Sequence, residues 1–169
     1  MTAPIRFALL GKSGSGKSQA GAIISDRFGL RHIKTGTICR QIAQLLFANE
    51  DKSSTQRLDD ALTQIDPSIF LRATLRNVEA REGFVVDALR FRSDLAIARD
   101  FGCRTIRIVA PGAVRLARLQ SRGQVFDPVL DGRHRSETEL DDAEVDFEIV
   151  NDADLAKLTA ALSRLAREG

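Results

Sequence analysis

The sequence predicts a three-layer α/β fold, in which helices cover both faces of a five-stranded parallel sheet. Apolar runs alternate with helical patterns along the chain, an order typical of parallel strands joined by crossover helices. A glycine-rich turn separates the first apolar run from the first helical pattern. No internal repeat or low-complexity linker interrupts the 169 residues, a length sufficient for one domain with a substantial core.

The first strand is expected at Ile5–Leu10 and the first helix at Gln19–Phe28. Between them, residues 11–18 read GKSGSGKS and fit the G-x-x-x-x-G-K-[ST] pattern of the P-loop. In this context backbone N–H groups and the helix N-terminus bind phosphate, whereas the alternative is a glycine turn with a surface lysine. The residues expected to bind a nucleoside triphosphate are Gly14, Ser15, Gly16, Lys17 and Ser18. Lys17 would reach the β- and γ-phosphates, and the Ser18 hydroxyl would ligate Mg²⁺.

The second strand is expected at Arg31–Lys34, and a helix at Thr37–Phe47. Thr35 and Arg40 flank the start of that helix, at the sheet edge where open α/β folds bind ligands. Because arginine can bind a monophosphate with two parallel hydrogen bonds, both residues are candidates for binding an acceptor phosphate. A helix cap and a solvated arginine are the alternative.

Two further helical stretches are expected between residues 55 and 81, and Pro67 marks their junction. They predict a helical, acceptor-binding insertion of about residues 36–66. The third strand is expected at Phe84–Asp87. An aspartate at such a strand end can hold Mg²⁺ directly or through water, so Asp87 is a candidate metal-binding and catalytic residue. Arg90 is a candidate for binding an acceptor phosphate; a capping turn is the alternative.

After a helix at Asp94–Phe101 and a strand at Arg104–Val109, the next helix is expected at Ala113–Gln120. Arg115, Arg118 and Arg122 recur at spacings of three and four, which place them on one helix face. Arginines on a closing lid neutralise charge during phosphoryl transfer, and we expect Arg118 and Arg122 to do so. A solvated helix face is the alternative.

Residues 123–135 combine glycine, proline and aspartate without clear periodicity, which predicts a mobile surface loop. We place a short lid at about residues 122–136, with Arg133 as a candidate substrate-binding residue. The acidic stretch Glu137–Glu148 is expected to be a solvated face. The last strand is expected at Asp146–Val150 and the last helix at Leu155–Arg167, so Asn151 in the turn between them would neighbour the adenine base.

Composition limits the partners. The formal net charge is +2, and the chain has no tryptophan or tyrosine, so neither a basic field nor an aromatic platform for nucleic acid is expected. Two distant cysteines indicate a reducing, cytoplasmic setting. No apolar run reaches the length of a membrane span.

Taken together, these motifs resemble the nucleoside monophosphate kinases. The segments 87–91, 134–137 and 147–152 are similar to the deoxynucleoside monophosphate kinases of bacteriophages. The resemblance implies a single P-loop kinase domain over residues 1–169, monomeric or homodimeric. It also implies Mg²⁺ and ATP as donor, with a (deoxy)nucleoside monophosphate as acceptor. Gly14 to Ser18 would hold ATP, and the acceptor would be held by Thr35, Arg40 and Arg90.

Two departures from that family are visible. Arginine follows Asp87 after only two residues, where adenylate kinases carry a longer Asp-Gly-Phe-Pro-Arg element. The short lid has no cysteine quartet, which excludes a zinc-bound lid.

Several alternatives remain open. Dephospho-CoA kinase and other small-metabolite kinases share the P-loop and the compact core. A GTP-driven switch would carry an Asn-Lys-x-Asp motif, which this sequence lacks. A nucleic-acid-dependent ATPase would need a basic or aromatic surface.

Overall fold

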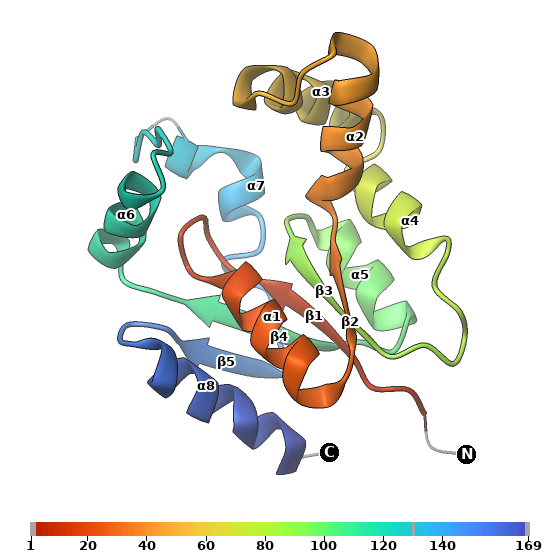
Figure 1. Cartoon of the computed structure of the whole chain (residues 1–169), viewed down its shortest axis with the longest axis vertical. Coiled ribbons are helices and arrows are strands. Elements are labelled where there is room, and N and C mark those ends of the chain that lie inside the picture. Colours follow the sequence, from red (N-terminus) through yellow and green to blue (C-terminus); the bar gives the residue numbers. More distant parts are fainter. Residues whose placement is uncertain (1–2, 130, 168–169) are drawn as a thin grey trace.

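The computed structural model describes residues 3–129 and 131–167, and its centre is a five-stranded sheet (Figure 1). The strands are β1 (Arg6–Leu10), β2 (Arg31–Lys34), β3 (Phe84–Leu89), β4 (Arg104–Val109) and β5 (Phe147–Val150). Their order is β2-β3-β1-β4-β5, and every neighbouring pair is parallel. The predicted three-layer α/β fold with five parallel strands is therefore confirmed.

Helices cover both faces of the sheet. The helices are α1 (Lys17–Phe28), α2 (Gly36–Phe47), α3 (Lys52–Ile65), α4 (Ile69–Leu75), α5 (Arg92–Asp100), α6 (Gly112–Ser121), α7 (Arg135–Thr138) and α8 (Leu155–Ser163). Figure 1 shows α1 and α8 on the near face, with α5 behind the sheet. The helices α2 and α3 project beyond one end of the sheet, and α6 and α7 form a second arm beside them.

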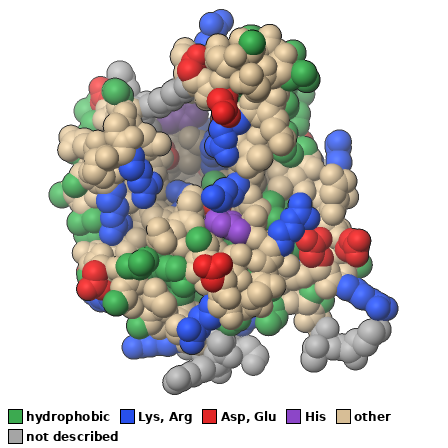
Figure 2. All heavy atoms as spheres, viewed as in Figure 1, with side chains coloured by type: hydrophobic (Ala, Val, Ile, Leu, Met, Phe, Trp, Pro, Cys, Tyr) green, Lys and Arg blue, Asp and Glu red, His purple; other side chains and the backbone are tan. Residues whose placement is uncertain are grey.

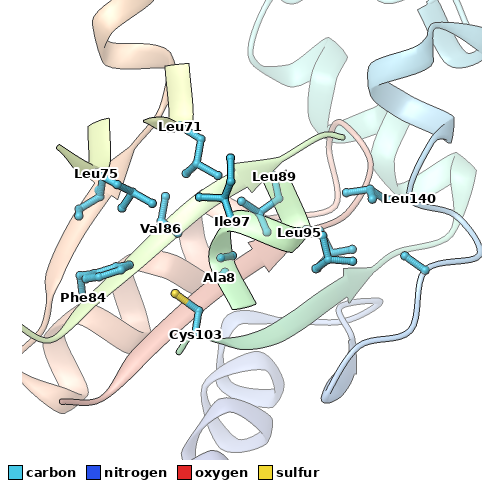
Figure 3. Packing of buried hydrophobic residues seen from close by; sticks show 14 residues of the cluster. Ala8, Leu71, Leu75, Phe84, Val86, Leu89, Leu95, Ile97, Cys103 and Leu140 are labelled. Atoms are coloured by element: carbon cyan, nitrogen blue, oxygen red, sulfur yellow. The ribbon is translucent and has the colours of Figure 1, made fainter. Parts of the chain in front are cut away.

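The alternation of side chains along β1 explains the layers. Phe7 and Leu9 pack with residues of α1 and α8, whereas Ala8 and Leu10 pack with residues of α4 and α5. All four side chains are at most 1% exposed. Figure 3 shows the second of these clusters, which includes Leu71 of α4, Val86 of β3 and Leu95 of α5. A strand buried on both faces reads as a continuous apolar run, as the sequence does here.

Some element boundaries differ from the sequence-based expectation. The strand β3 continues to Leu89 because Ala88 adopts φ +67°, with an irregular register against β1 that extends the pairing. The helix α3 starts at Lys52 rather than Thr55, because the Asp51 side chain caps it by accepting from the Ser54 N–H. The helix α4 already ends at Leu75.

The C-terminal half differs in similar ways. Asp146 precedes β5 rather than opening it, because its carboxylate accepts hydrogen bonds from the backbone N–H and hydroxyl of Thr105. The expected loop contains a 3₁₀ turn at Asp131–Arg133, followed by α7. The last helix ends at Ser163 and continues as a 3₁₀ turn over Arg164–Arg167.

Candidate functional site

The P-loop between β1 and α1 is packed too closely for a side chain at any of its three glycines, Gly11, Gly14 and Gly16. Gly14 adopts φ +77°, and a Cβ there would lie 2.6 Å from the backbone oxygen of Arg115 on α6. Gly16 adopts φ +98°, and a Cβ there would overlap the amide of Asn151. Only glycine combines these positive φ angles with such close approaches. The loop is therefore held between α6 and the turn after β5.

The side chain of Lys17 folds back against the start of the P-loop. Its Nζ donates hydrogen bonds to the backbone oxygens of Gly11 and Lys12, the latter at 3.0 Å. Desolvation lowers the pKa of Lys17 from 10.5 to about 8, although the negative charge of Glu137 opposes this shift. Ser18 is exposed at the start of α1, whereas Ser15 is 1% exposed. With a pKa of about 8, Lys17 is still mostly an ammonium ion at neutral pH and can bind phosphate oxygens beside the glycine loop.

Asp87 lies at the carboxyl end of β3 and is only 3% exposed. Its Oδ2 lies 3.0 Å from Nε2 of His32 on β2, while Oδ1 accepts no hydrogen bond within the described part of the chain. The negative charge of Asp87 also raises the pKa of Lys17. His32 thus fixes one carboxylate oxygen of Asp87, and the other oxygen has a free lone pair. A ligand that holds Mg²⁺, directly or through water, needs such an oxygen.

A cavity of about 390 Å³ opens between the P-loop, the helices α2 and α3, and the arm that contains α7. Its lining includes Ser13 and Lys17 of the P-loop, Arg40 of α2, Asp59 of α3 and Arg90 after β3. Figure 2 shows a hollow between the two arms, with Lys and Arg side chains gathered around it. The P-loop lysine and two arginines predicted to bind the acceptor therefore share one cavity.

Arg90 and Arg40, both predicted to bind the acceptor phosphate, differ in how firmly their side chains are held. Arg90 donates through Nη1 to both carboxylate oxygens of Asp59, at 3.0 and 3.1 Å, and its backbone N–H donates to Asp94 at 2.9 Å. Burial raises the pKa of Asp94, and these backbone hydrogen bonds oppose the shift. Arg40 is exposed and lies 3.4 Å from the Thr37 hydroxyl. Arg40 is the less constrained of the two arginines.

Thr35 does not line the large cavity. It is 7% exposed, and its hydroxyl lies 3.5 Å from the backbone oxygen of Asp87. It lines a smaller adjoining cavity of about 20 Å³ together with Asp59 and Arg90. In this conformation Thr35 joins the ends of β2 and β3.

The arginines of α6 separate into two groups. Arg118 reaches the backbone oxygens of Gly14 and Ser15 at 3.4–3.5 Å, and Arg115 donates to the backbone oxygen of Ser13 at 3.1 Å. Arg122 and Arg133 lie beyond the end of α6 and are exposed. Arg118 and Arg122 are predicted to neutralise charge during phosphoryl transfer, and that role stays a prediction for both; the sequence ranks Arg122 above Arg115, which contacts the P-loop.

Asn151 follows β5, and it is 7% exposed. Its Nδ2 donates to the backbone oxygen of Ser15 at 2.8 Å, and its Oδ1 lies 3.4 Å from Arg118. The Asn151 amide therefore supports the backbone of the P-loop through this hydrogen bond. Its predicted place beside the base stays a prediction.

The expectation of a solvated face at Glu137–Glu148 is wrong for Glu137, Glu139 and Asp146, whose carboxylates accept hydrogen bonds from distant segments. Glu137 on α7 accepts hydrogen bonds from both the backbone N–H and the hydroxyl of Ser13. Asp141 lies 2.8 Å from Nζ of Lys12. Both contacts cross more than 120 residues of sequence, which explains why local charge patterning did not reveal them.

Sequence reasoning missed His32 and Asp59 as neighbours of the predicted site residues. The available signals were weak: a histidine inside a short strand and an acidic pair on a helix. No group of three or more His, Cys, Asp or Glu suited to a metal occurs in residues 3–129 and 131–167. None of the helices described is long and apolar enough to cross a bilayer.

The chain is similar in sequence to cytidylate and adenylate kinases, although no protein-family model matches it. The chain is 30% identical over 165 residues to a cytidylate kinase from Rhodopseudomonas palustris, covering 95% of this chain and 68% of that protein. It is 28% identical over 134 residues to an adenylate kinase from Rhodococcus erythropolis, covering 73% of each chain. It spans 64% and 61% of the cytidylate kinases from Acholeplasma laidlawii and a Bradyrhizobium strain, less than two thirds of either.

Solved structures resemble the chain in fold. A protein from Thermus thermophilus superposes with a TM-score of 0.64 at 18% identity, covering 99% of this chain and 98% of that one. A shikimate kinase from Acinetobacter baumannii gives a TM-score of 0.59 at 12% identity, covering 98% and 94%. At such identities the likeness concerns the fold alone.

Proposed function

The chain belongs to the P-loop nucleoside monophosphate kinases, the family of the cytidylate and adenylate kinases that it matches, and we propose that it transfers the γ-phosphate of ATP to a (deoxy)nucleoside monophosphate. The products would be ADP and a nucleoside diphosphate. The protein would act on small nucleotides in the cytoplasm, as a monomer or homodimer, without nucleic acid.

The observation that carries this proposal is the shared cavity of about 390 Å³. It places the P-loop lysine, Lys17, in the same space as Arg40 and Arg90. A kinase for phosphorylated acceptors needs such an arrangement, because donor and acceptor phosphates must approach in line with their charges neutralised.

Each residue would have a distinct role. The P-loop residues 14–18 would bind the ATP phosphates, with Lys17 at the terminal ones. Arg40 and Arg90 would bind the acceptor phosphate, and Arg118 with Arg115 would neutralise charge on the migrating group. Ser18 and Asp87 would hold Mg²⁺, which would neutralise negative charge on the phosphates. No general base is needed, since a phosphate acceptor is already ionised.

The test is ADP release from Mg-ATP with a panel of acceptors. The panel holds dAMP, dGMP, dCMP and dTMP, their ribose counterparts, dephospho-CoA and shikimate, and the Lys17→Ala variant is the control. Turnover with a monophosphate that Lys17→Ala loses would support the proposal. Turnover only with dephospho-CoA or shikimate would favour the alternative of a small-metabolite kinase, and silence with every acceptor would contradict both.

A further inference from the structure

Glu137 places a carboxylate directly on the P-loop. Its Oε2 accepts the backbone N–H of Ser13 at 2.9 Å, and its Oε1 accepts the Ser13 hydroxyl. Two oxygens bearing one negative charge thus bind two donors of a single residue. This is the pattern in which an N–H and a hydroxyl would bind two oxygens of a phosphate.

The position of Ser13 indicates which phosphate these donors would meet. Ser13 precedes residues 14–18, whose backbone N–H groups the P-loop pattern assigns to the inner phosphates and whose Lys17 it assigns to the β- and γ-phosphates. It lines the same cavity as Lys17, Arg40 and Arg90, on the side from which an acceptor would approach. A triphosphate bound along the loop would therefore present its terminal oxygens there.

The negative charge of Glu137 acts on the same P-loop residues that a phosphate would contact. Among the charged groups that act on Lys17, Glu137 exerts the largest effect, and it raises the pKa of the ammonium against desolvation. Asp141, four residues further on, forms an ion pair with Lys12 at 2.8 Å. The helix α7 and the residues that follow it thus contact the loop through two carboxylates, at the consecutive loop residues Ser13 and Lys12.

We propose that the Ser13 N–H and hydroxyl form an oxyanion subsite for the terminal phosphate of the nucleotide, and that Glu137 fills this subsite until the nucleotide displaces it. The inference rests on the proposed use of ATP. It assigns Ser13 to substrate binding and makes Glu137 a competitor for the same donors.

Displacement predicts opposite effects for the two residues. Glu137→Gln keeps the shape of the side chain but removes the charge that competes with phosphate, so a triphosphate should bind more tightly. Ser13→Ala, introduced into the Glu137→Gln protein, removes a donor without altering a competitor, so the triphosphate should then bind less tightly. A diphosphate lacks the terminal group and should respond little to either change.

The experiment is calorimetric titration of the full chain with Mg-ADP and with a Mg-ATP analogue whose β,γ-bridge is an imido group. For Glu137→Gln we expect the Kd of the analogue to fall by about three- to tenfold and that of ADP to change by less than about twofold. Glu144→Gln is the matched control, since Glu144 is an exposed carboxylate of the same acidic segment with no contact to the loop. Circular dichroism verifies that each variant is folded, and Glu137→Ala provides a second substitution.

Weaker or unchanged binding of the analogue to both Glu137 variants would overturn the proposal. Equal tightening toward ADP and the analogue would also overturn it, because the competition would then not concern the terminal phosphate. The titrations need no acceptor, so they separate the two proposals. Tightening by Glu137→Gln in a protein without turnover would contradict the kinase function while supporting the subsite.

Discussion

Nε2 of His32 lies 3.0 Å from Oδ2 of Asp87, across the neighbouring strands β2 and β3. Both side chains are largely buried, with exposed fractions of 12% and 4%. Gly21 on α1 packs against the same imidazole, and a Cβ there would lie 2.5 Å from Nε2 and 2.8 Å from Cε1. The absence of a side chain at Gly21 therefore leaves the room in which His32 orients the carboxylate.

The first prediction concerns Gly21→Ala. Replacing a helix-interior glycine by alanine ordinarily stabilises a protein by about 0.5–1 kcal/mol, but here the new methyl group would displace the imidazole. We expect the variant to lose about 1–2 kcal/mol in free energy of unfolding, measured by urea denaturation, and to lose kcat as Asp87 shifts. In a His32→Ala background the same substitution should cost less, because the ring is gone. Equal losses in both backgrounds would show that the overlap is not the cause.

Lys17 gives a second prediction, for the dependence on pH. Burial holds its pKa at about 8 in the nucleotide-free protein, and phosphate binding needs the ammonium form. We expect kcat/KM for ATP to fall as the pH rises through about 8, whereas kcat should fall only at higher pH because bound phosphates raise the pKa. In the nucleotide-free protein, the folded state releases this proton near pH 8 and the unfolded state near 10.5. Stability from this group should therefore rise with pH between those values.

The control for Lys17 is Lys17→Arg, whose side chain keeps its charge throughout this range. Any activity that it retains should show no alkaline fall near pH 8. A wild-type profile of kcat/KM that stays flat well above pH 8 would remove Lys17 as its cause.

The third prediction ranks Arg115, Arg118 and Arg122 by how much each contributes to kcat. Arg115 and Arg118 contact P-loop carbonyl oxygens, whereas Arg122 is exposed. Alanine at either contacting position should lower kcat by about tenfold or more, because each supplies charge next to the phosphates. Arg122→Ala should cost less than about twofold. A large loss in Arg122→Ala would mean that the lid moves much further on substrate binding, and would restore the role predicted from sequence.

The comparison of sequence and structure shows where local patterns are sufficient. The P-loop and the five parallel strands follow from short segments, since apolar runs and glycine spacing are local properties. The partners of those residues are not local. His32 meets Asp87 across 55 residues, Asp59 meets Arg90 across 31, and Glu137 meets Ser13 across 124. A charge pattern along one segment cannot reveal such pairs, which depend on how the segments fold together.

Asp59 and Arg90 carry the fourth prediction. The carboxylate of Asp59 on α3 binds Arg90, and both residues line the cavity that contains Lys17. Asp59→Asn should raise the acceptor KM by about three- to tenfold while leaving the KM for ATP unchanged, because it frees the guanidinium from one orientation. Arg90→Ala and the double variant complete the cycle. Additive losses would show that the two residues act independently.

Asn151 provides the last prediction, which separates support of the loop from recognition of the base. Its amide donates to the backbone oxygen of Ser15 at 2.8 Å and packs against Gly16. Asn151→Leu should leave that carbonyl with only its 3.4 Å contact to Arg118, costing about 1–3 kcal/mol of unfolding free energy and raising the KM for nucleotide as the loop loosens. A supporting role predicts the same proportional rise for ATP and GTP. A rise confined to ATP, with GTP unaffected, would instead place the side chain beside the adenine. Asp152→Asn is the neighbouring control: its carboxylate pairs with Lys157 at the surface, so it should change neither value.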